Sequence, residues 1–177
     1  MERAMGLRNP AVAAPEWEFG GLVREHQAMV FSLASHFLRD HAAAEEVAQD
    51  VFLELHRHLA KLQSPEHLVF WLRRVTAYRA IDASRKRQRR AEVALDLVPE
   101  PVGSPPESDV WLGRRLRRLV ASLPEKTRML VVLRYQEEMD PADIAALMNM
   151  RVNTVKSQLQ RALKLLREKA GIPQVET

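Results

Sequence analysis

Amide, hydroxyl and cationic side chains recur near the C-terminal end of the chain, in a pattern suited to reading base pairs. They lie outside an apolar stripe of helical spacing and comprise Asn153, Thr154, Lys156, Ser157, Gln160 and Arg161. Asn and Gln pair with adenine in the major groove, and Lys and Arg contact guanine or phosphate. Residues 139–169 therefore predict a DNA-reading surface. The alternative is an ordinary helical hairpin with a solvated basic face.

Two helices joined by a tight turn should position these side chains. Asp140 is expected to cap the first helix, with Pro141 at its first position and Asp143 three residues after the cap. The break falls at Asn149, a residue type that adopts left-handed backbone geometry readily. The buried stripe of the second helix is expected to contain Met150, Val155, Leu159, Leu163 and Leu166. This helix-turn-helix geometry places the start of the second helix in the major groove.

A second stretch that fits nucleic acid interleaves aromatic and basic residues over 70–90. Trp71 and Tyr78 offer rings that stack on unpaired bases, while neighbouring cations track phosphates. The basic candidates here are Arg74, Arg79, Arg85 and Lys86. A solvated charge run, with Phe70 and Trp71 simply closing the core, is the alternative, and we expect Trp71 to do both.

An acidic and amide face on the preceding helical segment predicts a protein partner. Its members are Glu45, Glu46, Gln49 and Asp50. Surface carboxylates usually do nothing specific. The position of this face beside an arginine-rich helix favours an interface.

Composition narrows the function classes further. The chain has 177 residues, of which 46% are hydrophobic and 28% charged, with a net charge of +4 that favours an anionic partner. The absence of cysteine excludes disulfides, thiol catalysis and cysteine-ligated zinc. No apolar run approaches the roughly 20 residues of a membrane-spanning helix, and the N-terminal residues lack the apolar core of a signal peptide. We therefore expect a cytoplasmic protein without membrane insertion.

Patterns for catalysis, cofactors and metals are absent from the sequence. Glycines form no phosphate-cradling loop, and no serine stands in a nucleophile-elbow context. His56 and His58 are two residues apart on a predicted helix and so point to different sides, which argues against a shared metal. We expect no catalytic residue, no cofactor and no metal site.

The pattern of apolar residues predicts an all-α fold of two small helical domains. Helices are expected up to a break at Arg39 and Asp40, from about residue 42 to 59 with Asp40 as its cap, and from about 70 to 87, with further helices after residue 109. Residues 91–108 contain several prolines and acidic residues and no Lys or Arg, which favours a flexible linker between the domains. The predicted division is a disordered tail 1–15, a first domain 16–90, a linker 91–108 and a helix-turn-helix domain 109–171.

Four segments together resemble the signature regions of bacterial sigma factors of the extracytoplasmic-function group. In order they are AAAEEVAQDVFLELHRHL, FWLRRVTAYRAIDASRKRQRR, SLPEKTRMLVVLRY and DPADIAALMNMRVNTVKSQLQRALKLLRE. The resemblance implies a two-domain initiation subunit of RNA polymerase, in which Glu46, Gln49 and Asp50 face the clamp helices of the largest subunit. It implies that the third helical region, with Trp71, Arg74, Tyr78, Arg79, Arg85 and Lys86, opens and reads the minus-ten element. An anti-sigma factor is a further partner of such proteins.

The same resemblance assigns the second domain to the minus-thirty-five element and to the flap of the second-largest polymerase subunit. The chain departs from the family pattern at Tyr78, where Asn is frequent, at Asn149 and Asn153, where Gly is usual, and at Gln158, where Arg is common.

Two other functions also fit a helix-turn-helix: a free-standing transcription regulator, and a sigma mimic that sequesters a regulator. A simple repressor needs no docking surface like the acidic face of the second helix, and this favours the sigma factor.

Overall fold

The computed structural model describes residues 17–94, 116 and 118–170, and the regular structure within these ranges is entirely helical. We call residues 17–94 the first half and the described residues from 116 onward the second half. The all-α prediction is confirmed. The expected tail 1–15 and the linker from residue 95 onward lie outside the described residues.

The first half consists of α1 (Phe19–Leu38), α2 (His41–His58), a short 3-10 turn (Leu59–Lys61) and α3 (Pro65–Ala94). α1 ends at Leu38 and is followed by Arg39, whose φ of 56° is left-handed. The carboxylate of Asp40 then accepts a hydrogen bond from the Ala43 amide at 2.8 Å, which caps α2 as predicted.

α3 is longer at both ends than the sequence indicated. It begins at Pro65 because Ser64 caps it, with the hydroxyl accepting from the His67 amide at 3.2 Å and proline at the first helical position. The expected loop over 61–67 is therefore shorter. At its other end α3 continues to Ala94, past the expected linker boundary after residue 90.

The second half contains α5 (Glu125–Tyr135), α6 (Pro141–Met148) and α7 (Val152–Ala170). The turn between α6 and α7 uses Asn149 at φ 52° and ψ 52°, as its readiness for left-handed geometry predicted. The predicted side-chain cap by Asp140 is wrong. Its carboxylate makes no hydrogen bond to the first turn of α6 and lies instead 3.5 Å from Nη1 of Arg134.

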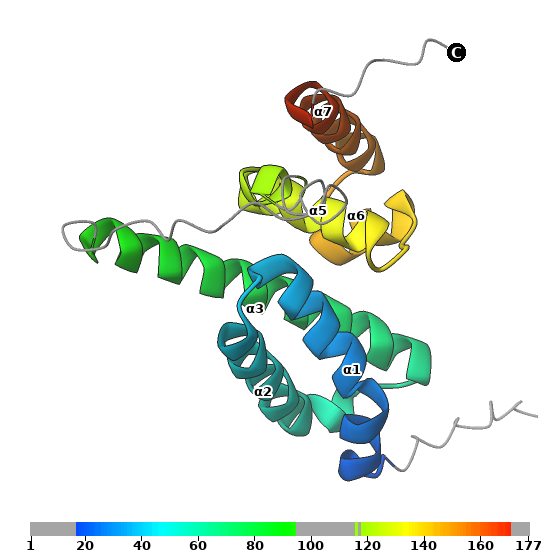
Figure 1. The fold of residues 1–177 in the computed structure, drawn as a ribbon. Coiled ribbons are helices and arrows are strands. Elements are labelled where there is room, and N and C mark those ends of the chain that lie inside the picture. Colours follow the sequence, from blue (N-terminus) through cyan, green and yellow to red (C-terminus); the bar gives the residue numbers. More distant parts are fainter. Residues whose placement is uncertain (1–16, 95–115, 117, 171–177) are drawn as a thin grey trace, which may run out of the picture.

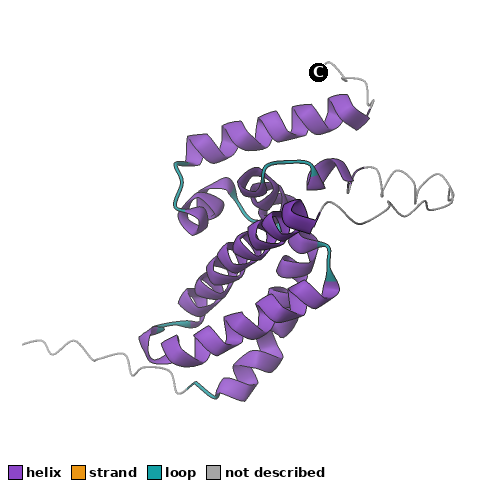
Figure 2. Cartoon of the chain, turned by 90° about the vertical axis from the view of Figure 1, so that its left-hand side faces the viewer, coloured by secondary structure: helices purple, strands orange, loops and turns teal. Residues whose placement is uncertain are grey.

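The two halves pack directly on one another. One apolar cluster lies within the three helices of the first half, with Val30, Val51, Leu55 and Leu72 fully buried. A second cluster crosses between the halves, joining Leu33, Phe37, Ala77, Ala80 and Ile81 of α1 and α3 to Met129, Leu130, Leu133, Ile144 and Leu147 of α5 and α6. Accordingly, α5 packs against α1 and α3, and α6 packs against α3 (Figures 1 and 2).

Candidate nucleic-acid interface

The N-terminal part of α7 presents the predicted base-reading side chains to solvent. Val155 and Leu159 are buried and fix the rotation of the helix, and Ala162 completes the stripe where Leu163 was expected, Leu163 being only half-buried. At the turn, the Met150 amide donates to the Ala145 carbonyl at 2.8 Å, which closes the C-terminal end of α6, and α7 then packs on α6. The polar side chains left exposed on this part of α7 are Asn153, Thr154, Lys156, Gln160 and Arg161.

Ser157 differs from its neighbours in this set. It is half-buried, and its hydroxyl donates to the Thr154 carbonyl one turn earlier at 3.0 Å. Its hydroxyl hydrogen is therefore committed within the helix, although the oxygen keeps accepting capacity.

The aromatic residues of α3 have two different surroundings. Trp71 is half-buried against the first apolar cluster, with its ring 5.8 Å from that of His58. Tyr78 is 38% exposed, and its hydroxyl donates to the Met148 carbonyl of α6 at 3.1 Å. The guanidinium of Arg74 lies 5.7 Å from the Tyr78 ring centre, in reach of a cation–π interaction. Trp71 thus has the structural part of its predicted dual role, and Tyr78 is the more accessible ring.

Two of the four predicted basic residues of α3, Arg79 and Arg85, form ion pairs, Arg79 with α2 and Arg85 with the second half. Nε and Nη2 of Arg79 donate to Oε2 of Glu54 on α2 at 3.1 and 2.6 Å, and this hydrogen-bonded pair raises the pKa of Arg79 above its ordinary value. Nε of Arg85 lies 3.8 Å from a carboxylate oxygen of Glu125 in the second half. Lys86 is exposed. Arg79 is therefore positioned by α2, whereas Lys86 is presented to solvent.

Sequence reasoning did not single out the ion pair between Arg87 and Asp40. Nη2 of Arg87 lies 3.0 Å from Oδ2 of Asp40. The pKa of Asp40 lies below its ordinary value, first because of the Ala43 amide hydrogen bond and then because of the charge of Arg87. The helix-cap pattern identified Asp40, but nothing in the spacing indicated that the far part of α3 returns to it.

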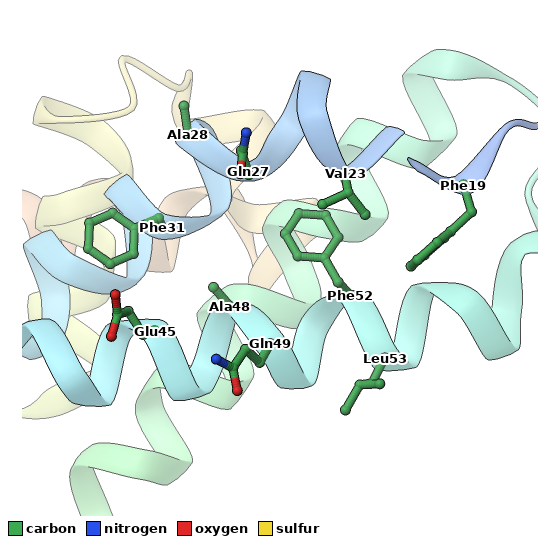
Figure 3. Close-up of a pocket in the computed structure, with 10 residues that line it drawn as sticks. All are labelled: Phe19, Val23, Gln27, Ala28, Phe31, Glu45, Ala48, Gln49, Phe52 and Leu53. Atoms are coloured by element: carbon green, nitrogen blue, oxygen red, sulfur yellow. The ribbon is translucent and has the colours of Figure 1, made fainter. Parts of the chain in front are cut away.

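The three polar residues predicted on α2 are all exposed, but they border two different hollows. Gln49, together with Glu45, lines an apolar groove of about 810 Å³ between α1 and α2 (Figure 3). Glu46 and Asp50 instead face the basic part of α3 and line a smaller hollow with Arg79, Lys86, Arg87 and Arg90. The proposed partner surface of α2 is therefore divided into an apolar side and a charged side.

The apolar groove was not identified from the sequence. In the close-up, Phe52 of α2 reaches toward Val23 of α1, and Phe19 and Phe31 lie at opposite ends of the row (Figure 3). Leu53 at its edge is 58% exposed. At helical spacing such residues look like ordinary core positions. Only the packing of α1 against α2 in the structure shows that they remain partly exposed.

The part of the chain that the structure describes contains neither a candidate metal-binding group nor a candidate membrane-spanning helix. Its His, Asp and Glu residues form no group of three or more that could hold a metal ion. None of the helices in the described ranges is long and apolar enough to cross a bilayer.

Comparison with known protein families identifies both halves. Residues 22–90 match the family model of Sigma-70 region 2, and residues 113–166 match that of Sigma-70, region 4. The chain is 30% identical over 165 residues to the ECF RNA polymerase sigma-E factor of Escherichia coli, covering 85% of each chain. The chain therefore belongs to the extracytoplasmic-function family of sigma factors.

Other relatives differ in how much of their length is matched. The probable RNA polymerase sigma factor RfaY of Xanthomonas campestris is 29% identical over 89% of this chain, which spans 41% of that protein. The ECF RNA polymerase sigma factor SigE of Mycolicibacterium smegmatis is 32% identical, and the chain spans 62% of it.

Solved structures share the fold. The sigma factor RpoE of Bartonella quintana, solved with the anti-sigma factor NepR, has a TM-score of 0.67 at 19% identity and covers 88% of this chain and 98% of its own. CnrH, solved with the cytosolic domain of CnrY, has a TM-score of 0.63 at 22% identity, covering 88% of this chain and 89% of its own.

Proposed function

We propose that this chain is a sigma factor that binds core RNA polymerase and directs promoter recognition, promoter opening and transcription initiation of a specific set of genes. The observation that carries the proposal is that one chain matches both region 2 and region 4 and presents exposed Lys and Arg side chains on both α3 and α7. It acts in the cytoplasm and has no catalytic activity of its own.

Each surface then has a role. Residues 16–90 form the domain that binds polymerase and the minus-ten element, and residues 109–171 form the domain that reads the minus-thirty-five element. The expected linker 91–108, of which residues 91–94 extend α3, joins them. Support for the polymerase contact comes from the exposure of Glu46, Gln49 and Asp50 on α2. The minus-ten contact is supported by Tyr78, Arg74 and Lys86 on α3, with Trp71, Arg79 and Arg85 partly committed to packing and ion pairs.

The minus-thirty-five contact falls on the exposed start of α7, where a helix-turn-helix meets base edges. The residues proposed for it are Asn153, Thr154, Lys156, Ser157, Gln160 and Arg161. Core polymerase is contacted through its largest subunit by α2 and through its second-largest subunit by the second half. An anti-sigma factor is a further partner, consistent with the complexes in which the similar folds were solved.

The experiment is retention on immobilised bacterial core RNA polymerase, followed by selection of bound DNA from a random library. The proposal expects retention at micromolar concentration or below, and enrichment of two spaced motifs only when polymerase is present. Binding of one duplex motif by the chain alone, with no retention on polymerase, would instead identify a free-standing regulator. Retention without enrichment of any DNA would identify a mimic of a sigma factor.

A further inference from the structure

Three exposed polar side chains form one row along the N-terminal part of α7. Lys156 follows Asn153 by three residues and Gln160 follows Lys156 by four, a spacing that places all three on one face of a helix. The buried stripe of the same helix, which includes Val155 and Ala162, lies on the other side and packs on α5 and α6. An amide, a cation and a second amide are therefore presented together to solvent.

The polar groups of this row are not used by the fold. Among the described residues, Asn153, Lys156 and Gln160 take part in no hydrogen bond or ion pair, whereas the Ser157 hydroxyl donates to a carbonyl of α7. An exposed amide without a partner in the protein can bind a ligand without first breaking an internal hydrogen bond. The row is therefore ready to bind an external partner with matching donors and acceptors.

The two amides match the major-groove edge of adenine. A carboxamide carries one acceptor oxygen and two N–H donors. Adenine presents the N6 amino donor and the N7 acceptor, so the amide oxygen of Asn153 or Gln160 can accept from N6 while its nitrogen donates to N7. Guanine presents two acceptors, O6 and N7, and leaves the amide oxygen without a donor. Each amide of the row therefore favours adenine over guanine.

The separation of the two amides predicts the spacing of the bases they contact. Gln160 follows Asn153 by seven residues, which corresponds to about 10.5 Å along an α-helix. Base pairs are stacked about 3.4 Å apart. An α7 that lies along the major groove thus places its two amides over base pairs about three steps apart. Lys156 lies between them, where its ammonium group can contact guanine or a phosphate.

We propose that Asn153 and Gln160 each read one adenine of the minus-thirty-five, or upstream, element, and that these adenines lie in base pairs about three steps apart. The proposed function of α7 underlies this inference, which names the bases that the helix recognises. The contact made by Asn153 is particular to this chain, because Gly, usual at this position in the family, has no side chain to offer a base.

The first test is selection from a library with a randomised upstream element, using the full-length chain bound to core polymerase. The wild type should enrich two A·T pairs about three steps apart. Asn153→Ala should lower the preference at one pair about fivefold or more, and Gln160→Ala should do so at the other. Gln158→Ala removes a half-buried amide of the same helix and is the matched control, which should keep both preferences.

A change of specificity gives a second measurement in the same selection. Asn153→Arg should replace adenine by guanine at the pair that Asn153→Ala no longer selects, because a guanidinium donates to both O6 and N7 of guanine. The other A·T pair should remain. Asn153 and Gln160 are exposed and Ala favours helix, so these variants should keep the helical content of the wild type, which circular dichroism measures.

Duplexes that contain 7-deazaadenine separate base recognition from a structural role of the amides. This base has carbon in place of N7 and cannot accept a hydrogen bond there. At the pair assigned to Asn153, it should weaken binding by the wild-type polymerase complex about fivefold, because an amide N–H loses its partner. The Asn153→Ala complex should lose little more, whereas Gln160→Ala should lose as much as the wild type.

The outcomes separate this inference from the proposed function. An enriched upstream motif that lacks the two A·T pairs, or that persists in both Ala variants, would overturn the inference and leave the proposed function intact. An equal effect of 7-deazaadenine on the wild type and on Asn153→Ala would overturn the contact between Asn153 and N7. If the polymerase complex enriches no upstream motif at all, the proposed function itself is contradicted, and the assignment of bases falls with it.

Discussion

The hydroxyl of Tyr78 on α3 donates a hydrogen bond to the main-chain carbonyl of Met148, the last residue of α6, at 3.1 Å. The last carbonyls of a helix have no partner within it, so this contact satisfies one of them from outside. It also ties the proposed minus-ten helix to the helix-turn-helix, which are separated by 70 residues in sequence. α3, which is proposed to read the minus-ten element, is therefore in direct contact with α6, the first helix of the proposed helix-turn-helix.

The proposed contact with polymerase predicts that reversing charges on α2 weakens binding. Reversing Glu46 and Asp50 together to lysine should weaken binding to core polymerase at least tenfold while leaving the helical content unchanged, because both side chains are exposed. Fluorescence anisotropy with labelled protein measures the affinity, and circular dichroism measures the helical content. Glu25→Lys on α1, at another exposed position, is the matched control. Full affinity in the double variant would remove the acidic face from the interface.

Promoter opening should depend on Tyr78 more than duplex binding does. In the complex with polymerase, Tyr78→Ala should lower open-complex stability by about 1 to 3 kcal/mol, because the lost base stack exists only once the strand is single. Tyr78→Phe should retain it. Permanganate footprinting reports opening and gel shift reports duplex binding. Equal losses in both measurements would contradict a stacking role. Trp71 is a poorer probe, because it is half-buried and its removal would also destabilise the first half.

Substitutions at the start of α7 should change sequence preference, whereas a substitution further along its exposed face should change affinity for all sequences. Replacing Asn153 or Lys156 by Ala should relax discrimination at one or two base pairs of the upstream element by about 1 to 3 kcal/mol. Arg161→Ala should instead weaken all sequences alike and lower the salt dependence by about one counterion. Binding of the polymerase complex to a library of upstream elements, repeated over a salt series, measures both. Unchanged sequence preference in the Asn153 and Lys156 variants would mean that α7 does not read bases.

Stability should depend on the protonation of Glu137, which is half-buried between the halves. Desolvation raises the pKa of this carboxyl above its ordinary value of 4.5, opposed by the charges of Arg73 and His36. An acid whose pKa is raised in the folded state binds its proton more tightly there than in the unfolded chain. The fold therefore loses stability as the pH rises from the ordinary pKa to the raised folded pKa. Glu137→Gln should therefore raise the melting temperature at pH 7, and the gain should shrink as pH falls below about 4.5. A gain of the same size at pH 4 and pH 7, measured by thermal denaturation, would exclude titration of Glu137 as its cause.

Local sequence patterns predicted most helices and turns well, but they predicted poorly how separate helices pack on one another. The left-handed turn at Asn149 and the cap by Asp40 follow from residue chemistry within a few positions, and both are confirmed. The start of α3 at Pro65 was missed because the cap residue Ser64 stands in a stretch that also fits a loop. Asp140 failed as a cap because Arg134 competes for its carboxylate.

For the candidate surfaces too, spacing within one helix was predictable from the sequence, whereas contacts between helices were not. Helical spacing alone predicted most of the exposed face of α7, although Ser157 is half-buried and Ala162 rather than Leu163 completes the buried stripe. The pairing of Arg79 with Glu54 and the hydrogen bond from Arg128 of α5 to α3 depend on how separate helices meet, which no spacing within one helix reveals. For the same reason, apolar residues of α5 and α6 looked like the core of one domain, whereas some of their partners lie on α1 and α3.

The most direct test of the central claim is run-off transcription with purified bacterial core polymerase on a template that carries the selected upstream and minus-ten motifs. The account predicts a defined transcript that requires both the chain and the motifs, and that is lost when Glu46 and Asp50 are both reversed in charge. Absence of any chain-dependent transcript from polymerase that is active with another sigma factor would contradict it.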